Sequence, residues 1–165
     1  MTNKNSLTPI LDTIKTPSDL KLLSLEDLQK LCKQLRADLI QRVNQAGGHF
    51  ASSLGVTEIT VALHKVLETP YDKIIWDVGH QAYIHKILTG RREDMLKVRQ
   101  LNGISGFPRP SESEYDAFVA GHAGNSISAA CGIIEASYHN YPEQTSHKVV
   151  AVIGDGAMTS GMAFE

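Results

Sequence analysis

A run of aliphatic residues at positions 149–153 constrains the fold of this chain more than any other feature. It reads Val-Val-Ala-Val-Ile, and Gly154-Asp155-Gly156-Ala157 follows at once. A short, uninterrupted aliphatic run is typical of a strand that is fully buried in a parallel sheet. Parallel strands need long crossovers, usually helical, so the chain is expected to alternate strands and helices.

The remaining sequence fits this expectation. Ser24 is the predicted N-cap of a helix that ends at Ala46-Gly47-Gly48. Further helices are predicted over residues 57–67, with Ile59, Leu63 and Val66 on the apolar face, and over residues 82–89, 92–100 and 127–138. A second strand is predicted over residues 74–78. Residues 1–22 are expected to form an N-terminal arm, residues 49–55 a short loop, and residues 102–118 an irregular loop. The predicted fold class is α/β, a parallel sheet flanked by helices.

Charge and hydropathy exclude several classes of partner. Lys and Arg total 16 against 18 Asp and Glu, and no basic run occurs, so nucleic acid and membrane surfaces are not expected partners. The longest aliphatic run is too short to span a bilayer, and the N-terminus lacks the apolar core of a signal peptide. Cys32 and Cys131 form no C-x-x-C pair. Together these features predict a cytoplasmic protein.

The predicted strand at 149–153 and the helix expected after it place Gly154-Asp155-Gly156 where ligands bind in parallel sheets, outside the carboxyl end of a strand. Free N–H groups at a helix start suit phosphate. Asp155 offers a hard oxygen ligand, and Mg²⁺ usually takes one or two carboxylates together with phosphate oxygens and water. The tripeptide alone is also typical of an ordinary turn, so the flanking elements carry the argument.

Two more glycine-containing loops meet the same description, residues 77–80 after a strand and residues 121–126 before a helix. All three are expected to converge at one edge of the sheet. His49, His80 and His122 lie in such loops and could bind diphosphate or relay protons to a carbonyl substrate. Each of these histidines could instead have a structural role. A structural role is preferred for His64, His139 and His147. His85 could face the site or solvent. The sequence contains no H-E-x-x-H motif, so a zinc site built from these histidines is not favoured.

Several motifs occur in one order along the chain. They are Gly-His-Phe-Ala-Ser-Ser-Leu-Gly at 48–55, Trp-Asp-Val-Gly-His-Gln-Ala-Tyr at 76–83, His-Lys-Ile-Leu-Thr-Gly-Arg at 85–91, Gly-Phe-Pro at 106–108, Ser-Glu-Ser-Glu-Tyr-Asp at 111–116, Gly121-His122, and Ile-Gly-Asp-Gly-Ala at 153–157. Over residues 8–165 the sequence resembles the N-terminal part of the 1-deoxy-D-xylulose-5-phosphate synthase family, within the transketolase-like thiamine diphosphate enzymes.

This resemblance implies a partial thiamine diphosphate-binding domain over residues 1–165. It implies a transferase, homodimeric as a whole, that joins pyruvate to D-glyceraldehyde 3-phosphate with loss of CO₂. The cofactors would be thiamine diphosphate and Mg²⁺. By the family pattern Asp155 is a metal ligand, and His49 and His80 act at the reacting carbon. The residues implied to bind the cofactor are His80, Gly121, His122, Ala123, Gly156 and Ala157.

Two departures limit the resemblance. Many relatives read Gly-His-Ser-Ser-Thr-Ser where this chain has Gly-His-Ala-Gly-Asn-Ser at 121–126, so side-chain hydroxyls are missing at Ala123 and Gly124. The sequence also stops in a helix expected from Met158, before the family's asparagine pair and second domain, so a fragment that is inactive alone is expected. The alternatives are a split transketolase-like subunit, a non-catalytic binding module and, more distantly, a metal-dependent hydrolase.

Overall fold

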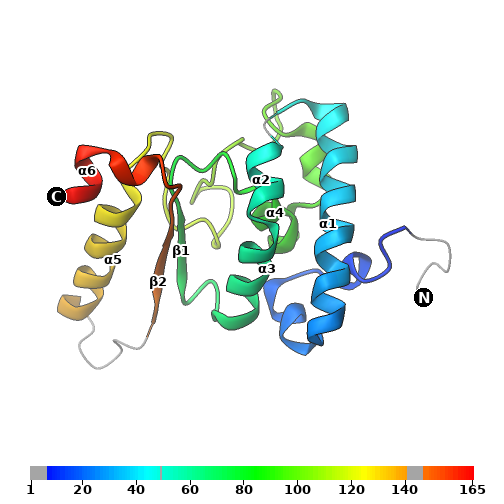
Figure 1. The fold of residues 1–165 in the computed structure, drawn as a ribbon, viewed down its shortest axis with the longest axis horizontal. Helices are drawn as coiled ribbons and strands as arrows, with labels where there is room; N and C mark the ends of the chain where they lie inside the picture. The colour runs from blue at the N-terminus through cyan, green and yellow to red at the C-terminus, as the bar shows by residue number, and fades with distance from the viewer. Residues whose placement is uncertain (1–6, 49, 141–146) are drawn as a thin grey trace. The chain divides into compact units, whose positions relative to one another are not determined.

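The computed structural model describes residues 7–48, 50–140 and 147–165 (Figure 1). These residues belong to two compact units. The first, called here the helical unit, comprises residues up to Leu67 together with Gln81–Gly106. The second, called here the sheet unit, comprises Glu68–His80 and Phe107–Glu165. The assignment of residues 1–165 to one partial domain stays a prediction.

The helical unit is built around one long helix, α1 (Leu25–Ala46), which Figure 1 shows beside α3. Its other elements are η1 (Leu11–Thr13), η2 (Pro17–Leu22), α2 (Ala51–Gly55), α3 (Thr57–Val66), α4 (Tyr83–Lys86), η3 (Ile87–Arg91) and η4 (Glu93–Lys97). The predicted cap of α1 is confirmed, because the Ser24 hydroxyl accepts the N–H of Asp27 at 3.1 Å. The helix ends at Gly47, where φ is 81°.

One face of α1 supplies much of the core of the helical unit. Leu28, Leu31, Leu35, Leu39 and Val43 recur every three or four residues and are all buried. Burying each leucine contributes about 1.5–3 kcal/mol. Leu25 has the spacing of this face but is 73% exposed, since it occupies the first position of the helix.

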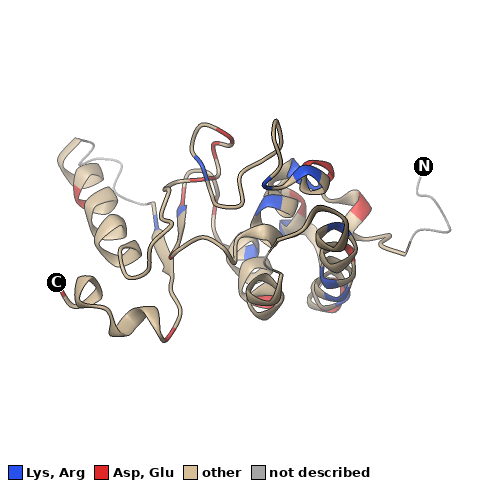
Figure 2. Ribbon diagram, turned by 90° about the horizontal axis from the view of Figure 1, so that it is seen from above, with Lys and Arg blue, Asp and Glu red and all other residues tan. Residues whose placement is uncertain are grey.

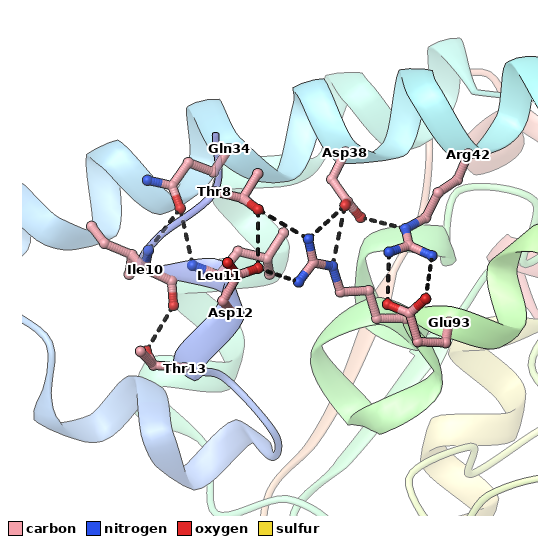
Figure 3. Close-up of polar contacts among 10 residues, drawn as sticks. Thr8, Ile10, Leu11, Asp12, Thr13, Gln34, Asp38, Arg42 and Glu93 are labelled. Atoms are coloured by element: carbon pink, nitrogen blue, oxygen red, sulfur yellow. Dashed lines mark hydrogen bonds and ion pairs between the residues drawn. The ribbon is translucent and has the colours of Figure 1, made fainter. Parts of the chain in front are cut away.

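The part of the predicted arm that the structure describes, residues 7–22, packs on α1 through η1 and on α3 through η2. Leu11 and Leu20 are buried in the core of the helical unit. The Gln34 side-chain oxygen accepts the N–H groups of Ile10 and Leu11 at 3.0 and 2.9 Å, which holds the start of η1 against α1 (Figure 3). These residues are therefore an integral part of the helical unit.

A network of charged side chains also joins this segment to α1 and η4 (Figure 3). Asp38 is 6% exposed and accepts hydrogen bonds from Arg42 Nε at 2.9 Å and from Arg92 Nη2 at 2.7 Å. Arg92 also binds Asp12 at 2.7 Å, and Arg42 binds Glu93 at 2.8 Å. Burial works against the charge of Arg42, but the hydrogen bonds to Glu93 and Asp38 outweigh it and raise the pKa of this guanidinium.

Three sequence-based expectations for the helical unit were inaccurate. Residues 50–55, expected as loop, contain the short helix α2. The helices expected over 82–89 and 92–100 are shorter pieces, with non-helical backbone at Thr89 and Gly90. Finally, α3 buries Thr57, Thr60, Val61 and His64 rather than the predicted apolar face, and Ile59 and Val66 are 52% and 67% exposed.

The sheet unit contains the parallel pair that the sequence predicts. Strands β1 (Lys73–Trp76) and β2 (Val149–Val152) pair in register from Lys73 opposite Val149 to Trp76 opposite Val152. Helix α5 (Ser126–Asn140) packs on this pair, next to β2 in Figure 1. The short elements η6 (Ala157–Thr159) and α6 (Gly161–Phe164) follow β2. The α/β fold class is therefore confirmed, as a small two-stranded parallel sheet among helices.

Two details of the sheet unit differ from the expectation. All four residues of β2 are only partly buried, because β2 pairs with one neighbour in a sheet of two described strands. The helix expected from Met158 is interrupted at Ser160, whose backbone is extended with φ −73° and ψ 147°. Residues 157–164 therefore form two short turns of helix.

Charged residues are unevenly distributed over the helices (Figure 2). Lys, Arg, Asp and Glu recur along α1, whereas α5 has Glu135 as its one charged residue of these four types. Despite this apolar composition of α5, no helix within the described ranges is long and apolar enough to cross a membrane.

Candidate functional site

The candidate site begins at Asp77, the first residue after β1. Asp77 is 2% exposed, and its carboxylate accepts the N–H of Gly124 at 3.0 Å and that of Ser126 at 3.2 Å. These N–H groups belong to the loop before α5 and its first turn, where a carboxylate is favourable for both hydrogen bonding and the helix dipole. The end of β1 thus anchors the loop that leads into α5.

A second contact joins the same two segments. The N–H of Gly121 donates to the carbonyl oxygen of Val78 at 2.9 Å. Val78 itself has φ of 60°, a conformation that costs a β-branched residue about 1–3 kcal/mol. A Cβ added to Gly79 would lie 2.7 Å from Pro108 Cδ, so only glycine fits there. Strained, closely packed backbone of this kind is frequent at ligand sites.

The loop after β2 meets the loop before α5. Gly124 has φ of 86°, and a Cβ added to it would lie 1.8 Å from Ser160 Oγ and 3.6 Å from the carbonyl oxygen of Ala157. Ser160 and the backbone carbonyl of Ala157 therefore lie close to Gly124. Because Trp76 and Val152 are paired at the ends of their strands, all three loops gather at the carboxyl edge of the sheet, as the sequence predicts.

The structure places most of the predicted site residues on these loops. His80 is half-buried in the loop after β1, and Asp155, Gly156 and Ala157 follow β2. Gly121, His122 and Ala123 are exposed in the loop before α5. His49 lies outside the described residues. The roles assigned to these side chains stay predictions.

These loops fit a phosphate group with a bound cation. Asp155 and the backbone at Gly154, Gly156 and Gly121 are exposed, and a Cβ added to any of these glycines would meet nothing within 4 Å. The edge is thus open to a ligand. In the described part of the chain no three His, Cys, Asp or Glu side chains gather as a metal site. A cation here would consequently need oxygens from a phosphate and water beside Asp155, the ligand set that suits Mg²⁺.

Two features of the site were missed from the sequence. The anchoring role of Asp77 is one of them, although an aspartate directly after a strand and two residues before Gly79 is a signal for a carboxylate that bonds nearby backbone. Ser160 gave no local signal, because its contact with Gly124 arises only in the folded chain.

The remaining histidines lie on other segments of the chain. His85 is fully buried, so it does not face solvent, and its Nδ1 lies 2.9 Å from Nε2 of His64. Burial, followed by the nearby His85, holds the pKa of His64 well below its ordinary value. His147 lies 3.1 Å from the Ser137 hydroxyl, a structural contact. His139 is exposed.

A parallel strand pair whose connecting loops are tied together at its carboxyl edge defines an α/β ligand-binding domain. Comparison with known proteins identifies which one: residues 11–165 match the family model described as 1-deoxy-D-xylulose-5-phosphate synthase, and the chain belongs to this family. The resemblance seen in the sequence motifs is thereby confirmed.

Individual relatives agree. The chain is 57% identical over 158 residues to the 1-deoxy-D-xylulose-5-phosphate synthase of Porphyromonas gingivalis, covering 96% of this chain and 24% of that protein. The enzyme of the same name from Pseudomonas entomophila is 57% identical over 160 residues, covering 96% and 25%. That of Syntrophomonas wolfei is 58% identical over 156 residues, covering 94% and 24%. The chain spans about a quarter of the length of the curated relatives it matches.

Proposed function

We propose that this chain forms part of a thiamine diphosphate-dependent synthase that condenses pyruvate with D-glyceraldehyde 3-phosphate. The product, 1-deoxy-D-xylulose 5-phosphate, would feed isoprenoid, thiamine and pyridoxal synthesis, and CO₂ would be released. The observation that carries this proposal is the junction at Asp77, whose carboxylate joins the end of β1 to the loop before α5 in a chain of this family.

The bound thiamine diphosphate would supply the electron sink for the carbanion that decarboxylation leaves. The residues of this chain would bind and orient it. Asp155 would give a carboxylate oxygen to Mg²⁺, and Gly156 and Ala157 would offer backbone N–H groups to the diphosphate. The cofactor would also contact His80, Gly121, His122 and Ala123, residues of the loops that Asp77 and Val78 hold together.

His80 and His49 would hold or move protons at the substrate oxygens, because a histidine changes protonation near neutral pH. We propose further that the whole enzyme is a cytoplasmic homodimer. The 165 residues alone would not convert substrate. Asp155 is the one carboxylate predicted as a metal ligand, and the chain covers only 24% of the Porphyromonas gingivalis relative.

A chimera tests this proposal without requiring activity from the isolated chain. The matching residues of the Porphyromonas gingivalis enzyme are replaced by those of this chain, and 1-deoxy-D-xylulose 5-phosphate formed from pyruvate and D-glyceraldehyde 3-phosphate is measured. We expect activity within about tenfold of the parent, because the two sequences are 57% identical over this region. In the chimera, Asp155→Ala is expected to lower activity at least about a hundredfold and to raise the Mg²⁺ concentration required.

The matched control is Glu135→Ala, which removes an exposed carboxylate from α5. A folded chimera that makes no product would contradict the proposal, as would Asp155→Ala with the activity of Glu135→Ala. The first outcome would favour the non-catalytic binding module.

A further inference from the structure

Two loops of the candidate site pack tightly against each other at Gly124 and Ser160. A Cβ added to Gly124 would lie 1.8 Å from Ser160 Oγ and 2.9 Å from Ser160 Cβ. Real Cβ atoms do not come this close, so Ser160 occupies the space of a side chain at position 124. The two backbones can pack in this way only because residue 124 has no side chain.

The contact is steric and not a hydrogen bond. Ser160 Oγ is buried, and within the described residues it has no hydrogen-bond partner. A hydroxyl without a partner adds no attraction that could hold the loops together. What Ser160 contributes is therefore volume that fits against the Gly124 Cα.

The pair connects the two halves of the candidate site. Gly124 lies in the loop that Asp77 fixes to β1, with its N–H 3.0 Å from the carboxylate. Ser160 ends the turn η6, where its N–H donates to the carbonyl oxygen of Ala157 at 3.2 Å. The carbonyl oxygen of Gly156 accepts the Thr159 hydroxyl at 2.7 Å, so the turn from Gly156 to Ser160 is internally bonded. A displacement of Ser160 would consequently move the segment that carries Asp155.

We propose that Gly124 and Ser160 are a positioning pair, which sets the distance between the predicted cofactor-binding loop at 121–126 and the predicted metal ligand Asp155. The assignment of these two loops to cofactor and metal rests on the proposed function. The pair touches neither group itself and acts through the two loops. If this is correct, a side chain at position 124 displaces the two loops only because Ser160 occupies the same space. Replacing Ser160 by glycine should then allow alanine at position 124 without that displacement.

The test uses the 165-residue chain with three variants, Gly124→Ala, Ser160→Gly and the double variant. Affinity for Mn²⁺ in the presence of millimolar inorganic pyrophosphate is followed by electron paramagnetic resonance. Gly124→Ala is expected to weaken Mn²⁺ binding at least about tenfold, as forced overpacking does. The double variant should return to within about threefold of the wild type, because only the cost of positive φ then remains.

A second measurement needs no ligand: the nuclear magnetic resonance chemical shifts of the Asp155 and Gly156 amides are compared among the same variants. They should move in Gly124→Ala and return in the double variant. Gly47→Ala is the matched control, since Gly47 also has positive φ, 81°, but a Cβ there meets nothing within 4 Å. It should change neither readout.

Failure of the pair and failure of the proposed function give different results. Wild-type chain that binds no Mn²⁺ with pyrophosphate would count against the phosphate and metal site itself, while the chemical shifts would still test the pair. A double variant whose shifts and affinity match those of Gly124→Ala would overturn the positioning pair, as would a Gly124→Ala variant indistinguishable from the wild type.

Discussion

Asp38 is the residue of the helical unit whose substitution gives the clearest test of the packing described above. Its carboxylate accepts hydrogen bonds from Arg42 and Arg92 while only 6% exposed (Figure 3). Asp38→Asn keeps the shape of the side chain but removes its charge. One carboxylate oxygen also becomes an NH₂ group, which cannot accept a hydrogen bond from a guanidinium.

The expected loss follows from the surroundings of the two arginines. Removing one partner of a buried ion pair costs about 3–5 kcal/mol, because a charge is left buried without compensation. Here Arg42 keeps Glu93 and Arg92 keeps Asp12, and the two arginine side chains are 11% and 21% exposed. Both factors lower the cost, so we expect the free energy of unfolding to fall by about 2–3 kcal/mol.

Urea unfolding followed by far-ultraviolet circular dichroism measures this change, because α1 contributes a large share of the helical signal. Glu26→Gln is the control: it breaks an ion pair with Lys30 on the same helix, but the Glu26 side chain is 76% exposed. A loss for Asp38→Asn no larger than that for Glu26→Gln would refute the reasoning, since burial would then make no difference to the value of the charge.

Three further predictions follow from single contacts. Because the pKa of folded His64 lies well below its unfolded value of about 6.5, its contribution to stability is complete above that pH and falls by about 1.4 kcal/mol per pH unit as the pH drops towards the folded pKa. His64→Gln should reduce this slope in urea unfolding between about pH 7.5 and 5.5, and an unchanged slope would exclude His64 as its source. Asp77→Ala should speed amide hydrogen exchange at Gly124 and Ser126, which lose their acceptor; exchange at the wild-type rate would contradict the anchoring role. The Lys65 ammonium donates to three backbone carbonyls at 2.7–3.2 Å, so Lys65→Met should lower the free energy of unfolding by about 2 kcal/mol, and no shift in the thermal midpoint would show that these contacts contribute nothing.

Local sequence signals were sufficient to predict the elements that have clear ends or a strong period. The serine cap and glycine exit of α1, the two strands and α5 are found close to their predicted positions. The buried face of α3 could not be predicted in this way, because Thr57, Thr60 and His64 are buried where hydrophobicity favours Ile59 and Val66. Tertiary packing overrides the pattern there, and α2 is too short for a period to show.

The candidate site shows the same division. Strand ends and glycines locate the three loops, because ligand loops follow the carboxyl ends of parallel strands. The contacts that hold them together join residues far apart in the chain: Asp77 and Gly124 are 47 residues apart. The identity of Gly124 as the partner of Asp77 has no local signature, and neither has the fit of Ser160 against Gly124. The side to which His85 points is also decided by its buried partner His64.

The parallel pairing of β1 with β2 has a consequence for the order of folding. Asp72, just before β1, bonds the N–H of Lys148, just before β2, across 76 residues of chain. During synthesis β1 must wait for this whole crossover before its partner strand exists, and closing such a long loop is slow. The loops of the candidate site extend from the ends of both strands, so they reach their native positions late. Trp76, the one tryptophan of the chain, lies in β1 opposite Val152, and its fluorescence would record that late step in refolding.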